Sequence, residues 1–347
     1  MNYVRKNIAA MAGYMPGEQP TDPAVVKLNT NENPYPPSPR ALEAVRATLE
    51  KLRKYPDPLG TEVRQTVARL FDVTVDNVIC GNGSDDLLTM AARAFTEPGR
   101  ALATCYPTYS LYETLAELQD APFESHECPE DFSLPVEALA ASKAPLVIVA
   151  NPNVPTGLAA PVAALERIAR SIPGVLLIDE AYVDFADDNA MRLARNEKNV
   201  LVMRTLSKSY SLAGVRFGFM VGPAEIITEL MKVKDSYNCD QLSLAAAKAA
   251  LEDQDWLREN VRKILAERTR LAVALRSLGF TVLDSQANCL FARTPKISAE
   301  QLYLQLKARG VMIRFFHRPR VREYVRITVG TPQENERLLA EIKTILG

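Results

Sequence analysis

The sequence is poor in the residues that metal sites and disulfide frameworks require. It contains only two histidines, and its five cysteines are scattered without a C-x-x-C pair, so neither a metal-ligand cluster nor a disulfide framework is expected. Scattered cysteines of this kind indicate reduced thiols and a cytoplasmic location. The formal net charge is −1, so no overall field attracts nucleic acid or an anionic membrane. No apolar run approaches the roughly 20 residues that span a bilayer.

The order of apolar and polar segments indicates an α/β protein. Near-continuous apolar stretches at 146–150, 175–178 and 200–203 alternate with helical segments. This pattern is typical of a mainly parallel sheet covered by helices on both faces. The length of 347 residues fits about two domains. We expect an N-terminal arm and part of a small domain over 1–50, a large domain over 51–284, and a smaller C-terminal α/β domain over 285–347.

Lys208 is the most informative residue, because it follows the apolar stretch at 200–203 in the segment Thr205-Leu206-Ser207-Lys208. Desolvation at the end of a buried strand disfavours the ammonium form, and a neutral amine can form a Schiff base with an aldehyde. Arg216, eight residues later, is a fixed cation that suits a phosphate. An aldehyde and a phosphate together suggest pyridoxal 5′-phosphate.

A second element is the turn 81–86, Gly-Asn-Gly-Ser-Asp-Asp, which follows a predicted strand and opens a predicted helix. Free backbone N–H groups at such a helix start can bind an anion. The turn matches neither the P-loop nor the dinucleotide-binding pattern. An ordinary capped turn is the alternative interpretation.

A third element is the run Asp179-Glu180-Ala181-Tyr182, directly after an apolar strand. A carboxylate there can pair with a protonated pyridine nitrogen and so keep the ring able to accept electrons. Tyr182 can reach the adjacent ring oxygen. The alternative is a carboxylate that caps a helix.

Taken together, these motifs resemble those of the fold-type I aminotransferases, the subgroup that includes the histidinol-phosphate aminotransferases. The resemblance runs from Tyr14 to Gly330. It implies that Lys208 carries the cofactor, with Asp179 and Tyr182 as further catalytic residues. The cofactor contacts that it implies are Tyr55, Ser84, Asp85, Tyr109, Asn153, Asp179, Tyr182, Thr205, Ser207, Lys208 and Arg216.

One position departs from the family pattern. The loop Asn151-Pro152-Asn153-Val154-Pro155 has valine where the family has an asparagine that contacts the cofactor's ring oxygen. Asn153 is the nearest replacement, so we take it as the expected contact.

The substrate contacts come from both ends of the chain. Arg326 lies in a β-like stretch, where an arginine needs a partner, and its planar fork suits a carboxylate. The resemblance assigns the substrate α-carboxylate to Arg326 and the distal part of the substrate to Arg314. It adds Tyr14 and Tyr55, the latter reaching the neighbouring subunit's site, and thus implies a homodimer with shared active sites. The other basic residues nearby are expected to form a solvated face: His317, Arg318, Arg320 and Arg322.

The reaction that the resemblance implies is a ping-pong transamination from glutamate to imidazole acetol phosphate, which gives L-histidinol phosphate in histidine biosynthesis. An aromatic amino acid aminotransferase of broad specificity and a threonine-phosphate decarboxylase remain alternatives, because both would use the same cofactor residues. A non-catalytic regulator is less favoured, since no basic DNA-binding segment is present.

Overall fold

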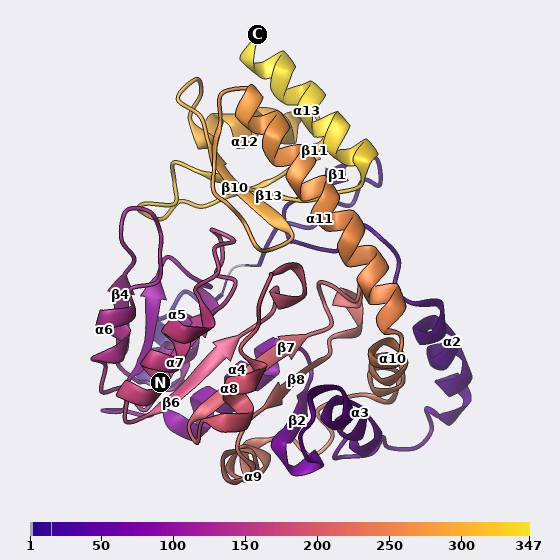
Figure 1. Ribbon diagram of the computed structural model, residues 1–347, viewed down its shortest axis with the longest axis vertical. Helices are drawn as coiled ribbons and strands as arrows, with labels where there is room; N and C mark the ends of the chain where they lie inside the picture. The colour runs from indigo at the N-terminus through magenta and orange to yellow at the C-terminus, as the bar shows by residue number, and fades with distance from the viewer. Residues whose placement is uncertain (1–2, 15) are drawn as a thin grey trace.

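The computed structural model describes residues 3–14 and 16–347, and its centre is a seven-stranded sheet (Figure 1). The strand order is β2-β8-β7-β6-β5-β3-β4. All the strands run parallel except β8, which pairs antiparallel with β2 and β7. The bounds are β2 Val78–Gly81, β3 Leu102–Tyr106, β4 Phe123–Glu127, β5 Leu146–Ala150, β6 Val175–Asp179, β7 Val200–Thr205 and β8 Gly218–Val221. The mainly parallel α/β architecture is confirmed, whereas the sequence pattern predicted neither β4 nor β8.

Helices cover both faces of this sheet, which explains why its strands are apolar throughout. Successive residues of a strand point to opposite faces, and Val147 accordingly packs in one core while Ile148 packs in the other. The first core includes side chains of α3 (Thr61–Phe71), α6 (Val136–Ala140), α7 (Val162–Ser171), α8 (Met191–Asn196) and α10 (Gln241–Glu252). The second includes side chains of α4 (Ser84–Phe95), α5 (Leu111–Leu118) and α9 (Ala224–Val233).

A second, smaller sheet lies above the first in Figure 1. Its order is β12-β13-β10-β9, and β1 pairs with β11 beside it. The bounds are β1 Val26–Lys27, β9 Thr281–Val282, β10 Cys289–Arg293, β11 Val311–Met312, β12 Arg314–Phe315 and β13 Val325–Thr328. The N-terminal segment therefore contributes a strand to this part of the molecule. The exact domain limits at 50 and 284 stay a prediction.

Three helices complete the smaller part: α11 (Gln254–Ser277), α12 (Ala299–Ala308) and α13 (Pro332–Leu346). The 24-residue α11 is the long helix that runs from the level of the large sheet to the small one in Figure 1. No helix among the described residues is long and apolar enough to cross a membrane.

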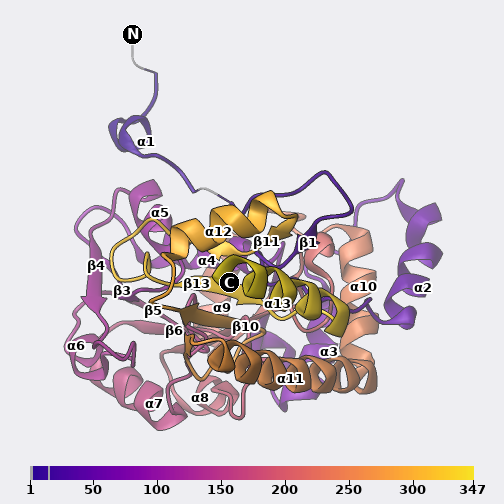
Figure 2. The same cartoon turned by 90° about the horizontal axis from the view of Figure 1, so that it is seen from above.

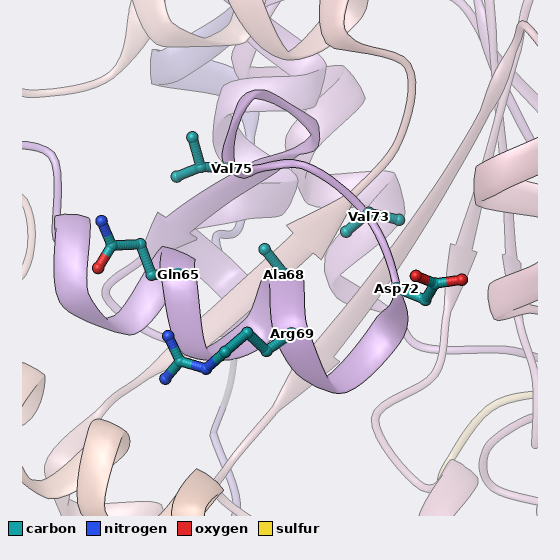
Figure 3. Close-up of a pocket in the computed structure, with 6 residues that line it drawn as sticks. All are labelled: Gln65, Ala68, Arg69, Asp72, Val73 and Val75. Carbon is teal, nitrogen blue, oxygen red and sulfur yellow. The ribbon is translucent and has the colours of Figure 1, made fainter.

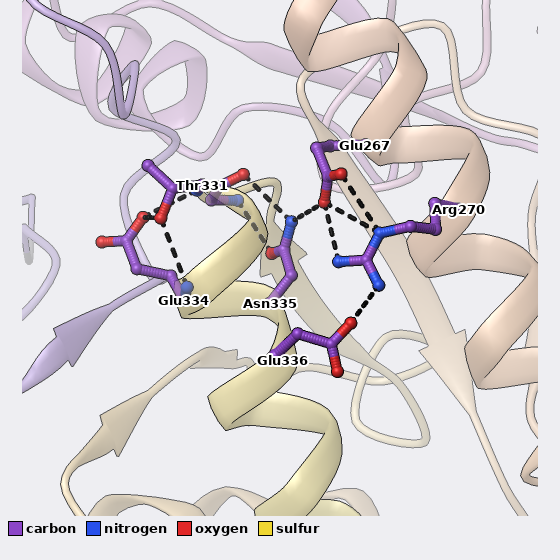
Figure 4. Close-up of polar contacts among 7 residues, drawn as sticks. Glu267, Arg270, Thr331, Glu334, Asn335 and Glu336 are labelled. Atoms are coloured by element: carbon purple, nitrogen blue, oxygen red, sulfur yellow. Dashed lines mark hydrogen bonds and ion pairs between the residues drawn. The ribbon is translucent and has the colours of Figure 1, made fainter.

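Polar contacts join α11 to the start of α13 (Figure 4). Thr331 and Glu334 form a reciprocal capping box at the N-terminus of α13. Asn335 Nδ2 donates to Glu267 Oε2 at 2.9 Å, and Glu267 also accepts from Arg270. These contacts fix β13, which ends just before α13, relative to the long helix.

The N-terminal arm lies on the outside of the molecule, as Figure 2 shows for α1 (Lys6–Ala10). Two side chains attach it to the end of α5: Arg5 Nη2 donates to Leu118 O at 2.9 Å and Asn7 Nδ2 to Glu117 O at 2.8 Å. Further along, α2 (Pro39–Thr48) packs against α10. Between the two helices, the arm crosses the edge of the large sheet where the candidate residues gather.

Candidate active site

The carboxyl ends of β2, β3, β5, β6 and β7 lie at one edge of the large sheet, because these strands are parallel to one another. Ligands of open α/β sheets bind at such an edge. Most of the candidate residues lie at these ends or within a few residues after them: Ser84, Asp85, Tyr109, Asn153, Asp179, Tyr182, Thr205, Ser207 and Lys208. The fold therefore brings together motifs that are up to about 120 residues apart in the sequence.

Lys208 is partly buried in the loop after β7. Its Nζ donates to Thr30 O of the N-terminal arm at 3.0 Å and lies 5.8 Å from the centre of the Tyr182 ring. Burial, followed by the positive charge of Arg326, lowers the pKa of Lys208 to about 8. A substantial fraction of the amine is therefore neutral near physiological pH, as a nucleophile or general base requires.

Asp179 is buried at the end of β6, with both carboxylate oxygens engaged. Tyr112 Oη donates to Oδ2 at 2.7 Å, and Ala181 N donates to Oδ1 at 3.1 Å. Burial raises the pKa of Asp179 to about 6, although the bond from Tyr112 acts in the opposite direction. A positively charged partner placed beside Asp179 would therefore stabilise its ionised form. The sequence analysis did not identify Tyr112. The only feature that could have indicated it is its position three residues after Tyr109.

The turn before α4 has the features of a phosphate site. Gly83 precedes the helix without any side-chain cap, which leaves the first N–H groups of α4 without a capping acceptor. Gly83 has φ +80, and a Cβ there would meet Arg216 Nη2 at 2.6 Å. Arg216 also approaches Ser207 Oγ at 3.4 Å and Asp85 Oδ2 at 3.3 Å. Uncapped N–H groups, a hydroxyl and a guanidinium converge here, so these residues fit a phosphate group.

Thr205 supports this turn from β7. Its Oγ1 donates to Ser207 Oγ at 2.9 Å and accepts from Ser207 N at 3.2 Å. Both residues are buried. Thr205 therefore orients the hydroxyl of Ser207, which lies next to Arg216.

Tyr109 lies between the candidate phosphate-binding turn and Asp179. Its Oη is 3.4 Å from Asp85 Oδ1, and its ring contacts Tyr112 edge-on at 5.6 Å. The ring of Tyr14 meets it edge-on at 5.9 Å. The structure thus brings Tyr14 and Tyr109 together within one chain.

The side chain of Asn153 forms its hydrogen bonds with other groups of the protein. Its Nδ2 donates to Pro107 O at 2.9 Å, and its Oδ1 accepts from Thr108 Oγ1 at 2.8 Å and from Val154 N at 2.9 Å. This geometry favours a role in fixing two loops to each other. The direct contact with a ring oxygen stays a prediction that these bonds do not favour.

Arg314 and Arg326 approach the site from the small sheet, on paired strands. Both guanidinium groups lie over the ring of Phe316, at 5.4 and 5.6 Å. Arg326 Nη2 donates to Asn29 O at 2.7 Å, but its buried Nε has no hydrogen-bond partner among the described residues. This unpaired buried donor on a cation is able to bind an anion.

Tyr55 is not brought to this edge within the chain. It is 81% exposed and stacks on Tyr237, with ring centres 4.6 Å apart. Its predicted contact with a neighbouring subunit stays a prediction.

Of the basic residues before Arg326, His317, Arg318 and Arg322 are exposed, as expected for a solvated face, whereas Arg320 is half-buried. Arg318 Nη1 pairs with Glu113 at 2.6 Å and Arg320 Nη1 with Glu127 at 3.0 Å. Between them, Pro319 O accepts a 2.6 Å bond from Tyr106 Oη. The segment therefore attaches the small sheet's loop to β3, β4 and α5, because carboxylates far away in the sequence neutralise it.

A buried ion pair, which the sequence did not indicate, holds the loops after β6 and β7. Arg204 Nη2 lies 2.8 Å from Glu180 Oε2, and its Nη1 lies 3.8 Å from Asp184 Oδ1. Asp184 in turn accepts a bond from the hydroxyl of Ser209. These contacts connect Glu180, which follows Asp179, to Ser209, which follows Lys208.

A concavity elsewhere on the surface contains none of these residues (Figure 3). It lies beside α3 and is lined by Gln65, Ala68, Arg69, Asp72, Val73 and Val75. Its lining does not combine a nucleophile with a base. Within 3–14 and 16–347, no three or more histidine, cysteine, aspartate or glutamate side chains are grouped so that they could hold a metal ion.

Comparison with known proteins agrees with this geometry. The family model of the class I and II aminotransferases matches residues 23–342. A histidinol-phosphate aminotransferase of Nostoc sp. is 47% identical over 99% of this chain and 98% of its own. One of Geotalea uraniireducens is 43% identical over 99% of both chains. The crystal structure of histidinol-phosphate aminotransferase from Sinorhizobium meliloti in complex with pyridoxal 5′-phosphate has a TM-score of 0.87 at 27% identity, covering 92% of this chain and 90% of that one. The chain therefore belongs to the class I and II aminotransferases and, within them, to the histidinol-phosphate aminotransferase family.

Proposed function

We propose that this protein is a pyridoxal-phosphate-dependent aminotransferase that converts imidazole acetol phosphate and L-glutamate to L-histidinol phosphate and 2-oxoglutarate, a step of histidine biosynthesis. The observation that carries the proposal is the position of Lys208. Its amine, with a pKa lowered to about 8, lies in one site with the buried carboxylate of Asp179 and a turn that could bind a phosphate. The curated relatives do not favour the aromatic aminotransferase or the decarboxylase alternative.

The cofactor's phosphate would be held by the turn before α4. The N–H groups of Ser84 and Asp85, the Ser207 hydroxyl and Arg216 provide the donors, and Thr205 orients Ser207. The carboxylate of Asp85 faces Arg216 and Tyr109 instead, so we assign it the role of orienting these two side chains.

The cofactor's ring would lie beside Tyr109, with Asp179 at its nitrogen and Tyr182 at its ring oxygen. When bound, pyridoxal 5′-phosphate supplies an electron sink for the electrons left at the substrate Cα after deprotonation. Asp179 favours the protonated ring nitrogen, because a buried carboxylate gains most from a cation beside it.

Lys208 would first hold the cofactor through its Nζ and then act as the general base and acid of the reaction. Once an amino donor has displaced it, its free amine would take the proton from the substrate Cα as the base and would later release that proton as the acid. Burial favours the neutral amine that the first of these transfers requires. Thr30 O, at 3.0 Å, holds Nζ in place.

The substrate would be bound by the two arginines of the small sheet. Arg326 has an unpaired Nε for the α-carboxylate. Arg314, which lies close to Gly17 of the arm, would take the distal phosphate with Tyr14 beside it. Both glutamate and the phosphorylated substrate are anionic, so two neighbouring guanidinium groups suit either one.

A homodimer with shared sites is part of the proposal. Tyr55, which stacks on Tyr237, is exposed, and so are Leu52 and Leu59, three and four residues away from it in the sequence. An exposed aromatic and apolar patch of this kind is typical of a protein interface. We further propose a cytoplasmic location, since all five cysteines are free thiols.

Genetic complementation tests the proposed function. The gene should restore growth without histidine to a bacterial strain that lacks this transaminase, whereas Lys208→Ala should not. The purified protein should also form more than one equivalent of 2-oxoglutarate per active site from glutamate only when imidazole acetol phosphate is present. Failure of the wild-type protein in both assays would contradict the proposed substrate.

A further inference from the structure

Asn31 of the N-terminal arm is fully buried next to the candidate site. Its backbone has φ +57, a left-handed conformation that asparagine, aspartate and glycine tolerate best. Its main chain is held on both sides: Asn31 N donates to Thr328 Oγ1 at 2.9 Å, and Asn31 O accepts from Asn288 Nδ2 at 3.0 Å. The residue is thus attached to β13 and to the segment before β10.

The orientation of the Asn31 carboxamide follows from its bonds to Thr328. The Thr328 hydroxyl accepts from Asn31 N, and its own proton points to Asn31 Oδ1 at 3.0 Å. A flipped carboxamide would place a donor there and leave the Thr328 proton without that acceptor. Nδ2 therefore faces the other way, toward Tyr182 Oη at 3.1 Å.

The bond from Asn31 determines what Tyr182 can do with its own proton. Because Oη accepts from Asn31 Nδ2, the hydroxyl proton must point elsewhere. No hydrogen bond from that hydroxyl to an acceptor occurs within the described part of the chain. Burial raises the pKa of Tyr182 to about 12, so the proton is retained at neutral pH. It is available to an acceptor that enters the site.

We propose that Asn31, oriented by Thr328, is a positioning residue that directs the Tyr182 hydroxyl proton toward the ring oxygen of the bound cofactor. This inference rests on the proposed function, since it needs a cofactor with an ionised ring oxygen. A donor to that oxygen stabilises its charged form and lowers the pKa of the proton-binding group conjugated with it. Asn31 thereby affects the protonation of the cofactor without touching it.

The test measures the pH midpoint of the visible absorption change of the bound cofactor, without any substrate. Asn31→Asp keeps a residue that tolerates the left-handed backbone but replaces the donor by an acceptor, so that Tyr182 turns its proton away from the site. We expect the midpoint to rise by about one pH unit, the effect of losing a hydrogen bond to a charged oxygen. Thr328→Val should raise it too without adding a charge, whereas Thr328→Ser, which retains the hydroxyl, should keep the wild-type midpoint.

A second background separates positioning from a general effect on the site. In a Tyr182→Phe protein, Thr328→Val should cause no further shift, because the proton that it orients is gone, and Asn31→Asp should retain only the shift that its added charge causes. Shifts of equal size in both backgrounds would overturn the inference, as would an unchanged midpoint in the Tyr182-containing variants. A wild-type protein that shows no cofactor band at all would overturn the proposed function, and this inference with it.

Discussion

Tyr112 Oη donates a 2.7 Å hydrogen bond to Asp179 Oδ2, and both residues are buried. The phenol comes from α5 and the carboxylate from the end of β6, so the bond joins a covering helix to the catalytic edge of the sheet. It also lowers the pKa of a carboxyl group whose burial acts in the opposite direction. Tyr112 therefore helps to keep Asp179 ionised.

Removal of this bond should weaken cofactor binding in acid. In Tyr112→Phe the pKa of Asp179 rises further above its usual range, so the carboxylate is protonated at a higher pH than in the wild type. We expect the pH below which the cofactor dissociates to rise by about one unit. Equilibrium dialysis of the cofactor across pH measures this. Tyr109→Phe is the matched control, because Tyr109 contacts Asp85 rather than Asp179, and an equal shift in that control would contradict the account.

The lowered pKa of Lys208 predicts the pH dependence of cofactor attachment. Only the neutral amine reacts with an aldehyde, and with a pKa of about 8 in place of 10.5 half of it is neutral near pH 8. The rate at which cofactor-free protein regains its visible band should therefore rise with pH around a midpoint near 8. Arg326→Gln removes the positive charge that contributes to the shift, so its midpoint should lie higher. A midpoint near 10 in the wild type would contradict the assignment.

Arg314 should determine the preference for a phosphorylated substrate. We expect Arg314→Ala to raise KM for L-histidinol phosphate by about 10- to 100-fold, the effect of losing a charge-assisted hydrogen bond. The activity with L-phenylalanine should change little. Arg318→Ala serves as the control, because Arg318 pairs with Glu113. Equal losses with both substrates would show that Arg314 holds the fold rather than the phosphate.

Arg320 should contribute to the stability of the contact between the small sheet's loop and the large sheet. It donates to Cys128 O and Pro129 O and lies 5.2 Å from the centre of the Phe132 ring. Its replacement by alanine should lower the free energy of unfolding by about 1–3 kcal/mol, whereas alanine at the exposed Arg322 should change it by less than about 0.5 kcal/mol. Chemical denaturation of both variants compares them, and equal values would contradict the attachment.

The sequence predicted those parts of the fold and site that depend on local pattern. Apolar runs located the parallel strands β5, β6 and β7, and the reactive side chains at their carboxyl ends indicated Lys208 and Asp179. The parallel strand β4 was not predicted. The strand β8 was missed because four residues that begin with a glycine give too little pattern. Asn31 and Tyr112 were missed for a different reason. Asn31 acts through Tyr182, 151 positions away, and Tyr112 acts through Asp179, 67 positions away. A local sequence pattern cannot predict contacts over such separations.

The most direct measurement mixes the cofactor-loaded protein with a single amino compound and follows visible absorption over one turnover. L-Histidinol phosphate and L-phenylalanine are compared at equal concentration. The account predicts rapid loss of the cofactor band with L-histidinol phosphate and little change with L-phenylalanine, because we propose that Arg314 and Tyr14 bind the distal phosphate. Equal loss with phenylalanine would contradict the phosphate-selective site, and a protein that cannot be loaded with the cofactor would contradict the role of Lys208.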